Sequence, residues 1–171
     1  MTMTTTKMTL KTEGDKYFVV TRRFAASPEA VYRAHTEPSL LQKWLLGPDG
    51  WSVPVCVSEA LPGGKIRYEW ADGKGKVFYL TSEYLALEPF RRIVHVERMH
   101  LPNPTPDNHV ETTFEPDGNS TVMTIRMTLP DAKTREGMLA SGMEHGTESS
   151  YARHTVGAPS GTQGCIYRKQ R

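Results

Sequence analysis

Alternating apolar and polar positions fill the middle of the chain, from residue 51 to residue 129. Clusters rich in Pro, Gly, Asp and Asn divide this region into segments. Such clusters between alternating segments are typical of antiparallel strands joined by turns. The pattern therefore predicts six strands, at residues 51–61, 65–70, 76–87, 92–100, 109–115 and 121–129. Their inward positions are expected to include Ile66, Tyr68, Trp70, Val110, Thr112, Phe114, Met123, Ile125, Met127 and Leu129.

A seventh strand is predicted at residues 17–24, which are rich in aromatic and β-branched side chains. Two short helices should follow it, at residues 28–36 and 40–46. Ser27 is a typical N-cap for the first of these, with Pro28 at the first helical position. Two helices thus separate the first strand from the rest of the sheet.

A long helix is predicted from Asp131, a suitable N-cap, to residue 153. Its inward face would carry Met138, Leu139, Gly142, Met143, Gly146, Ser149 and Ser150, and its outward face Glu136, Glu144, Thr147 and Glu148. The centre of the inward face is small because two glycines lie four residues apart. We expect Gly142 to border a cavity and Gly146 to contact the sheet closely.

These elements predict an α+β fold, in which a curved antiparallel sheet wraps around the C-terminal helix. We expect one domain over residues 15–153, a flexible N-terminus over residues 1–14 and an irregular tail over residues 154–171. The tail has no hydrophobic period and should add little stability.

Composition narrows the possible functions. The net charge of +2 does not show the excess of basic residues that is typical of proteins that bind nucleic acids or membranes. No secretion signal or apolar membrane span is visible, so Cys56 and Cys165 are interpreted as free thiols in a reducing cytoplasm. Zinc spacing, a phosphate-binding loop and a G-x-S-x-G motif are also missing from the sequence. Cys56, in a valine-rich strand, should be inert.

Two groups of polar residues could carry chemistry. His95 and Glu97 share one side of a predicted strand. Inside a cavity they could orient a ligand or act as acid and base, whereas outside they would form a cross-strand surface pair. A surface or structural role is the interpretation we favour. Glu144, His145 and Glu148 have helical spacing, but they are expected to form a solvated charged face rather than a metal site.

Aromatic side chains offer a third candidate. Trp44, Trp51, Tyr68, Trp70 and Tyr79, together with the helix methionines, could line a pocket for a planar apolar molecule. The same residues could equally form an ordinary core. The pattern alone leaves both interpretations open.

Four segments resemble a known superfamily. They are RRFAASPEAVYRAHTEPSLLQKW at residues 22–44, GGKIR at 63–67, LEPFRRIVH at 87–95 and SGMEHGTESSYAR at 141–153. Together they resemble the SRPBCC superfamily, and within it the bacterial proteins grouped with the C-terminal domain of the activator of Hsp90 ATPase. The resemblance covers about residues 17–153 and implies a helix-grip fold like that of the START and birch-pollen-allergen proteins, with a cavity between sheet and helix.

The resemblance does not imply one activity, because members bind hydrophobic ligands, some relatives are enzymes, and the eukaryotic namesake is a co-chaperone. We expect non-catalytic binding of a small hydrophobic molecule in that cavity, without a cofactor or metal. The expected ligand-binding residues are Trp44, Trp51, Tyr68, Trp70, Tyr79, His95, Glu97, Met123, Met138, Gly142 and Met143. Two alternatives remain open. One is a co-chaperone-like module that binds a protein partner such as a chaperone, and the other is a small-molecule hydrolase or cyclase that uses His95 or Glu97. We expect a monomer or homodimer that binds neither nucleic acid nor membrane.

Overall fold

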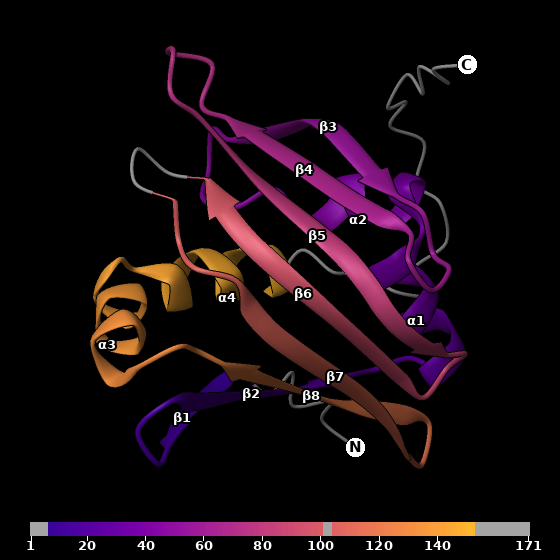
Figure 1. Cartoon of the computed structure of the whole chain (residues 1–171). Helices are drawn as coiled ribbons and strands as arrows, with labels where there is room; N and C mark the ends of the chain where they lie inside the picture. The colour runs from indigo at the N-terminus through magenta and orange to yellow at the C-terminus, as the bar shows by residue number, and fades with distance from the viewer. Residues whose placement is uncertain (1–6, 101–103, 153–171) are drawn as a thin grey trace.

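The computed structural model describes residues 7–100 and 104–152, which form a curved eight-stranded antiparallel sheet and four helices (Figure 1). The strands are β1 (Thr9–Glu13), β2 (Tyr17–Phe24), β3 (Ser52–Ser58), β4 (Lys65–Ala71), β5 (Val77–Glu88), β6 (Arg92–His100), β7 (Asn108–Asp117) and β8 (Ser120–Thr128). The helices are α1 (Pro28–Thr36), α2 (Pro38–Trp44), α3 (Ala132–Ala140) and α4 (Met143–Ala152). The predicted fold class, a helix-grip arrangement of α+β type, is confirmed.

The strand order is β1-β2-β8-β7-β6-β5-β4-β3, so the first long strand pairs with the last, as the helix-grip fold requires. All six central strands occur close to their predicted bounds. The N-terminal segment differs from the prediction, because residues 9–13 are not loose. They form β1, which pairs with β2 along its whole length, and Met8 beside it is buried. The predicted tail lies outside the described residues.

Edge strand β3 closes the sheet on the other side. It pairs only with β4 among the described strands, and its register shifts between Ser52 and Val55. Pro54 lies within this irregular stretch. A proline has no N–H to donate to a ladder, which is why prolines in sheets are confined to edges and bulges. This sequence therefore suits an edge strand.

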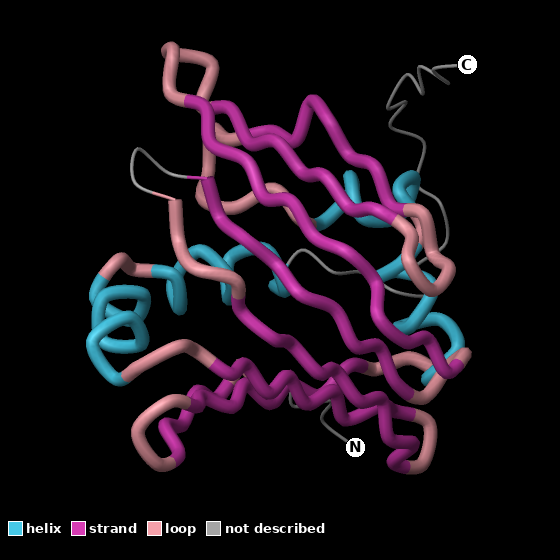
Figure 2. The backbone as a smooth tube through the Cα atoms, in the orientation of Figure 1, coloured by secondary structure: helices cyan, strands magenta, loops and turns pink. Residues whose placement is uncertain are grey.

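The core lies between the concave face of the sheet and the helices. Figure 2 shows α1, α2 and α4 (cyan) behind the strands (magenta). Alternation places every second residue of β7 and β8 in this core, as predicted, with Val110, Phe114, Met123 and Met127 all buried. Helix α1 begins as expected, because the Ser27 hydroxyl accepts a hydrogen bond from the N–H of Ala30, at 3.3 Å.

The C-terminal helical segment is not continuous. Asp131 caps it as predicted, accepting a hydrogen bond from the N–H of Thr134 at 2.7 Å. However, α3 ends at Ala140 and α4 begins at Met143. Gly142 between them has φ +80° and is exposed, a left-handed conformation that glycine adopts without steric cost. The prediction of one continuous helix over residues 131–153 is therefore wrong.

An ion pair fastens α4 to the sheet. Arg22 of β2 is 3% exposed, and its Nη1 donates to Oε2 of Glu148 over 2.5 Å. The backbone N–H of Met8 donates to the same oxygen, at 2.9 Å. Glu148 was expected on the solvent side, and this expectation is wrong because the break at Gly142 rotates α4 relative to a continuous helix.

Tyr151 continues the attachment one turn later. Its ring stacks on Trp44, with centroids 5.2 Å apart, and meets Phe24 edge-on at 5.7 Å. The neighbouring Ser150 accepts a hydrogen bond from the N–H of Gly47, at 2.8 Å. These two are the buried residues of α4, whereas α3 has none. The end of α4 therefore anchors the whole C-terminal segment.

The two helix glycines should respond oppositely to alanine. A methyl at either position meets no atom within 4 Å, so the expected close contact at Gly146 is wrong. Gly142→Ala forces alanine into a left-handed conformation and should lower the free energy of unfolding by about 1 to 2 kcal/mol. Gly146→Ala removes a flexible residue from a helix and should raise it by up to about 1 kcal/mol. Urea denaturation measures both, and a stabilising Gly142→Ala would contradict the break between α3 and α4.

Acid should weaken the attachment of α4. Burial alone would raise the pKa of Glu148, but the hydrogen bonds from Arg22 and Met8 and the charge of Arg22 leave it below its usual 4.5. The pair therefore stabilises the fold above about pH 4.5, and this contribution is lost as the pH falls further. At neutral pH, Glu148→Gln should cost about 2 kcal/mol of unfolding free energy, and its difference from the wild type should shrink in acid. Glu144→Gln, at an exposed position of the same helix, is the matched control. An equal effect of both variants would show that the pair contributes nothing.

Candidate functional site

A group of polar side chains lies on the inner face of β5, β6 and β7. His95 is directly opposite Tyr84, and Glu97 is directly opposite both Ser82 and Asn108. Residues directly opposite each other in antiparallel strands share one face of the sheet. Because Tyr84, Ser82 and Asn108 are buried, His95 and Glu97 also face the interior. The surface position expected from the sequence is therefore wrong, whereas a structural role for the pair stays a prediction.

His95 and Glu97 form a hydrogen-bonded pair. Nε2 of the imidazole lies 3.0 Å from Oε2 of the carboxylate. The two side chains are 17% and 16% exposed, so this inward-facing pair is not fully covered. A carboxylate only accepts, so Nε2 donates, and in the neutral imidazole Nδ1 then presents a lone pair. Nδ1 is buried and has no hydrogen-bond partner within the described ranges.

Asn108 supplies a second unpaired acceptor. The residue is 1% exposed, and its Nδ2 donates to the sulfur of Met138 on α3, at 3.8 Å. Its Oδ1 has no hydrogen-bond partner in the part of the chain that the structure describes. An unpaired polar group in a protein interior costs about 1 to 3 kcal/mol. Two such acceptors on adjacent strands therefore mark this patch of the inner face.

Hydroxyl groups continue the polar face toward β3. The Ser58 hydroxyl donates to the carbonyl of Thr36 and lies 2.7 Å from the hydroxyl of Tyr84. Burial raises the pKa of Tyr68 well above its usual value, and it raises the pKa of Tyr84 to about 12. Burial likewise raises the pKa of the Cys56 thiol to about 12. These groups are protonated at neutral pH, and a protonated thiol is a poor nucleophile, which supports the expectation for Cys56.

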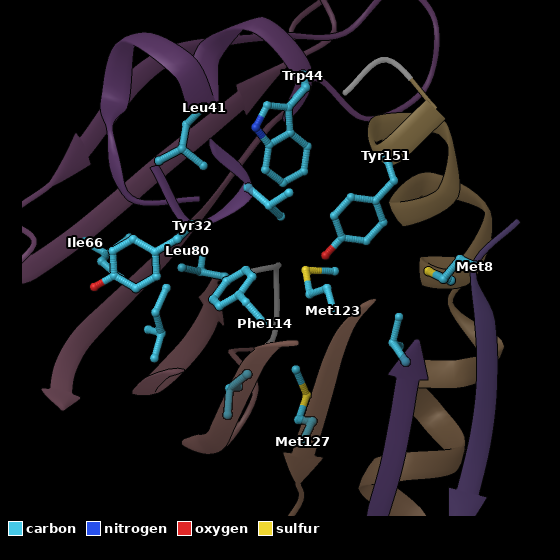
Figure 3. Packing of buried hydrophobic residues seen from close by; sticks show 14 of the residues in the cluster. Met8, Tyr32, Leu41, Trp44, Ile66, Leu80, Phe114, Met123, Met127 and Tyr151 are labelled. Atoms are coloured by element: carbon cyan, nitrogen blue, oxygen red, sulfur yellow. The ribbon is translucent and has the colours of Figure 1, made fainter. Parts of the chain in front are cut away.

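The tryptophans mainly build the core. The indole N–H of Trp44 donates to the carbonyl of Ala34, and that of Trp70 to the carbonyl of Leu45, both at 3.0 Å. Trp51 packs on Phe78, with centroids 5.2 Å apart. In the close view of Figure 3, the hydroxyl end of Tyr151 points toward Met123, which is fully buried.

Among the predicted site residues, Tyr68, His95, Glu97 and Met138 meet on or against the inner face. Trp44 and Met123 lie deeper in the core, and Met143 packs against it from α4. Two predicted residues are not brought together with these. Tyr79 lies on the outer face, stacked on His100 at 4.3 Å, and Gly142 is exposed at the helix break.

Sequence reasoning missed Asn108 and Arg22. Asn108 continues the inward series of Val110 and Phe114 by one further step, so the alternation of β7 was the available signal. Arg22 similarly occupies an inward position between Val20 and Phe24. A polar residue at an inward position of an apolar series indicates a partner or a site.

Other kinds of site find no support within residues 7–100 and 104–152. No group of three or more His, Cys, Asp or Glu side chains there could hold a metal ion. Glu144 and His145 are exposed, as expected for a solvated face. None of the helices in these ranges is both long and apolar enough to cross a lipid bilayer.

Comparison with known proteins gives a family and a set of similar folds. The model of a family described as "Activator of Hsp90 ATPase homolog 1-like protein" matches residues 25–154. A solved protein from Rhodobacter sphaeroides is 27% identical, with a TM-score of 0.80 over 86% of this chain and 95% of that chain. A solved protein from Mycobacterium smegmatis is 20% identical, with a TM-score of 0.79 over 91% of this chain and 99% of that chain. No curated protein matches the chain.

Replacing the buried amide should stabilise the protein. Asn108→Leu keeps the branched shape of the side chain and removes the unpaired carbonyl oxygen. We expect the free energy of unfolding to rise by about 1 kcal/mol, as measured by urea denaturation. Asn119→Leu, in the exposed turn between β7 and β8, should give no such gain. A loss of stability in Asn108→Leu would show that the amide is satisfied in the folded protein.

Proposed function

The chain belongs to the family of activator of Hsp90 ATPase homolog 1-like proteins, and from this premise we propose that it binds a small, largely apolar molecule between the concave face of its sheet and its C-terminal helices. The family and the fold indicate ligand binding or an activator-type role. One observation favours the ligand: the His95–Glu97 pair faces the interior and still keeps 17% and 16% of its side-chain surface exposed. An inward pair with open surface is expected beside a space that a small molecule can enter.

The composition of the surrounding face suits such a molecule. Ligand sites are mostly apolar, with a few polar groups that fix orientation. Here Met138, Leu139 and Met143 are half-buried against the core from the helix side. Methionine side chains adapt to irregular shapes. The polar positions on the sheet side are His95, Glu97 and Asn108. The proposed ligand therefore lies between the apolar side chains of α3 and α4 and the polar side chains of β6 and β7.

The activator-type alternative would need an apolar surface for a protein partner. The large exposed apolar side chains in the described ranges are spread over β3, β5 and two turns, namely Val57, Leu61, Val77, Leu85 and Phe90. Because they belong to separate elements, this distribution gives less support to partner binding than the inner face gives to ligand binding.

The hydrolase or cyclase alternative would use the same pair, with Nδ1 of His95 as base. A covalent mechanism would also need an activated side-chain nucleophile nearby. Burial holds the thiol of Cys56 and the phenol of Tyr68 in their protonated forms. This favours binding over covalent catalysis.

Dye binding tests the proposed location. N-phenyl-1-naphthylamine, a neutral apolar fluorophore, should bind the full chain saturably at one site. His95→Trp fills the inner face and should weaken this binding about tenfold or more. His100→Trp changes a histidine on the outer face of the same strand and should keep the affinity within about twofold. Native mass spectrometry of the purified protein complements this test by detecting a retained ligand.

Folding of both variants is verified by circular dichroism before the titrations are compared. Wild-type dye affinity in a folded His95→Trp variant would place the binding site elsewhere and would contradict the proposal.

A further inference from the structure

We propose that the polar end of the ligand carries two hydrogen-bond donors and no carboxylate, and that it binds Nδ1 of His95 and Oδ1 of Asn108. This inference rests on the proposed function and names the chemical class of its ligand. The best-matched molecules are apolar bodies that end in neighbouring hydroxyl groups or in an amine.

On β6 and β7, the unused hydrogen-bonding capacity of the inner face is that of two acceptors, whereas on β2 the Nε of Arg22 is a buried donor without a partner among the described residues. Nε2 of His95 is taken by Glu97, which leaves the lone pair of Nδ1. Nδ2 of Asn108 is directed at the sulfur of Met138, which leaves Oδ1. The opposite amide orientation would direct oxygen at sulfur and pair two acceptors, so the assigned orientation is the favourable one. A ligand that satisfies both atoms must therefore donate twice.

The two acceptors lie within reach of one small molecule. Asn108 is directly opposite Glu97, and His95 is two residues away on the same face. Such diagonal neighbours on adjacent strands are separated by roughly 7 to 8 Å between their backbones, and less between side chains. A head group with two adjacent donors can bridge this span.

The local charge disfavours an acid. The Glu97 side chain lies 3.0 Å from the imidazole and contributes negative charge to the site. Arg22 is a cation on the inner face of a different strand, β2; Glu148 accepts from its Nη1 at 2.5 Å and offsets its charge, although its buried Nε has no hydrogen-bond partner among the described residues. A ligand carboxylate would meet Glu97 and two further acceptors. Fatty acids and other carboxylates are therefore poor candidates.

Access to Asn108 depends on Met138. This side chain covers the amide from α3, a helix without a single buried residue among its described positions. A flexible, half-buried methionine on a helix without fully buried residues can be displaced at small cost. An apolar ligand body would replace the contacts of Met138, and its donors would then reach the uncovered acceptors.

Three probes with one aromatic body test the inference by calorimetric titration of the full chain. They are naphthalene-2,3-diol with two donors, 2-naphthoate with a carboxylate, and 2-methylnaphthalene with neither. We expect the affinity of the diol to be at least about tenfold higher than that of 2-naphthoate. Asn108→Leu should weaken diol binding about fivefold or more and leave 2-methylnaphthalene within about twofold. Asn119→Leu should change neither affinity, and His95→Phe is a second variant that removes the other acceptor.

The outcomes separate the two proposals. Binding of 2-methylnaphthalene without a preference for the diol, or with a preference for 2-naphthoate, overturns the donor requirement and leaves the binding site intact. Diol affinity that is unchanged in both folded variants, Asn108→Leu and His95→Phe, also overturns it. Failure of all three probes to bind the wild type overturns the proposed function together with this inference.

Discussion

The ion pair between Arg22 and Glu148 determines how the inner face of the sheet is covered. A helix normally buries an apolar stripe against its sheet, and that burial holds it in place. Here α3 buries no residue, and α4 buries only Ser150 and Tyr151. The ion pair and the aromatic contacts of Tyr151 therefore add to the attachment given by the half-buried Met138, Leu139 and Met143 and by Arg135, which donates to the carbonyl of Gly14 at 2.6 Å. A guanidinium at 3% exposure would be costly without its carboxylate, so the pair also constrains where α4 can lie.

This mode of attachment has a consequence for the interior. The helices α3 and α4 cover their part of the sheet mainly with half-buried side chains, namely Met138, Leu139 and Met143. The residues beneath that region are His95, Glu97 and Asn108, which would be unfavourable under a tightly packed helix. The polar residues of the inner face thus occur where α3 contributes half-buried side chains and no fully buried residue.

The sequence predicted the sheet well because each turn has a local signature. Glycine, proline and asparagine clusters located all six central strands, and alternation identified the inward side of β7 and β8. The helix break was missed because a glycine such as Gly142 fits either a helix interior or a helix end, and tertiary packing decides between them. The orientation of His95 was missed for a related reason. Alternation groups residues by side, but only pairing with Tyr84 and Asn108 shows which side is inner.

The irregular start of β3 affects how this sheet behaves in a crowded solution. An open strand edge is a template on which another chain can add, and such addition is a common route to aggregation. Pro54 removes one donor from that edge, and the register shift between Ser52 and Val55 interrupts its straight ladder. An incoming strand would find neither a continuous row of donors nor a flat partner. One proline and one bulge at the margin thus help to keep an eight-stranded sheet from recruiting a ninth strand from a neighbouring molecule.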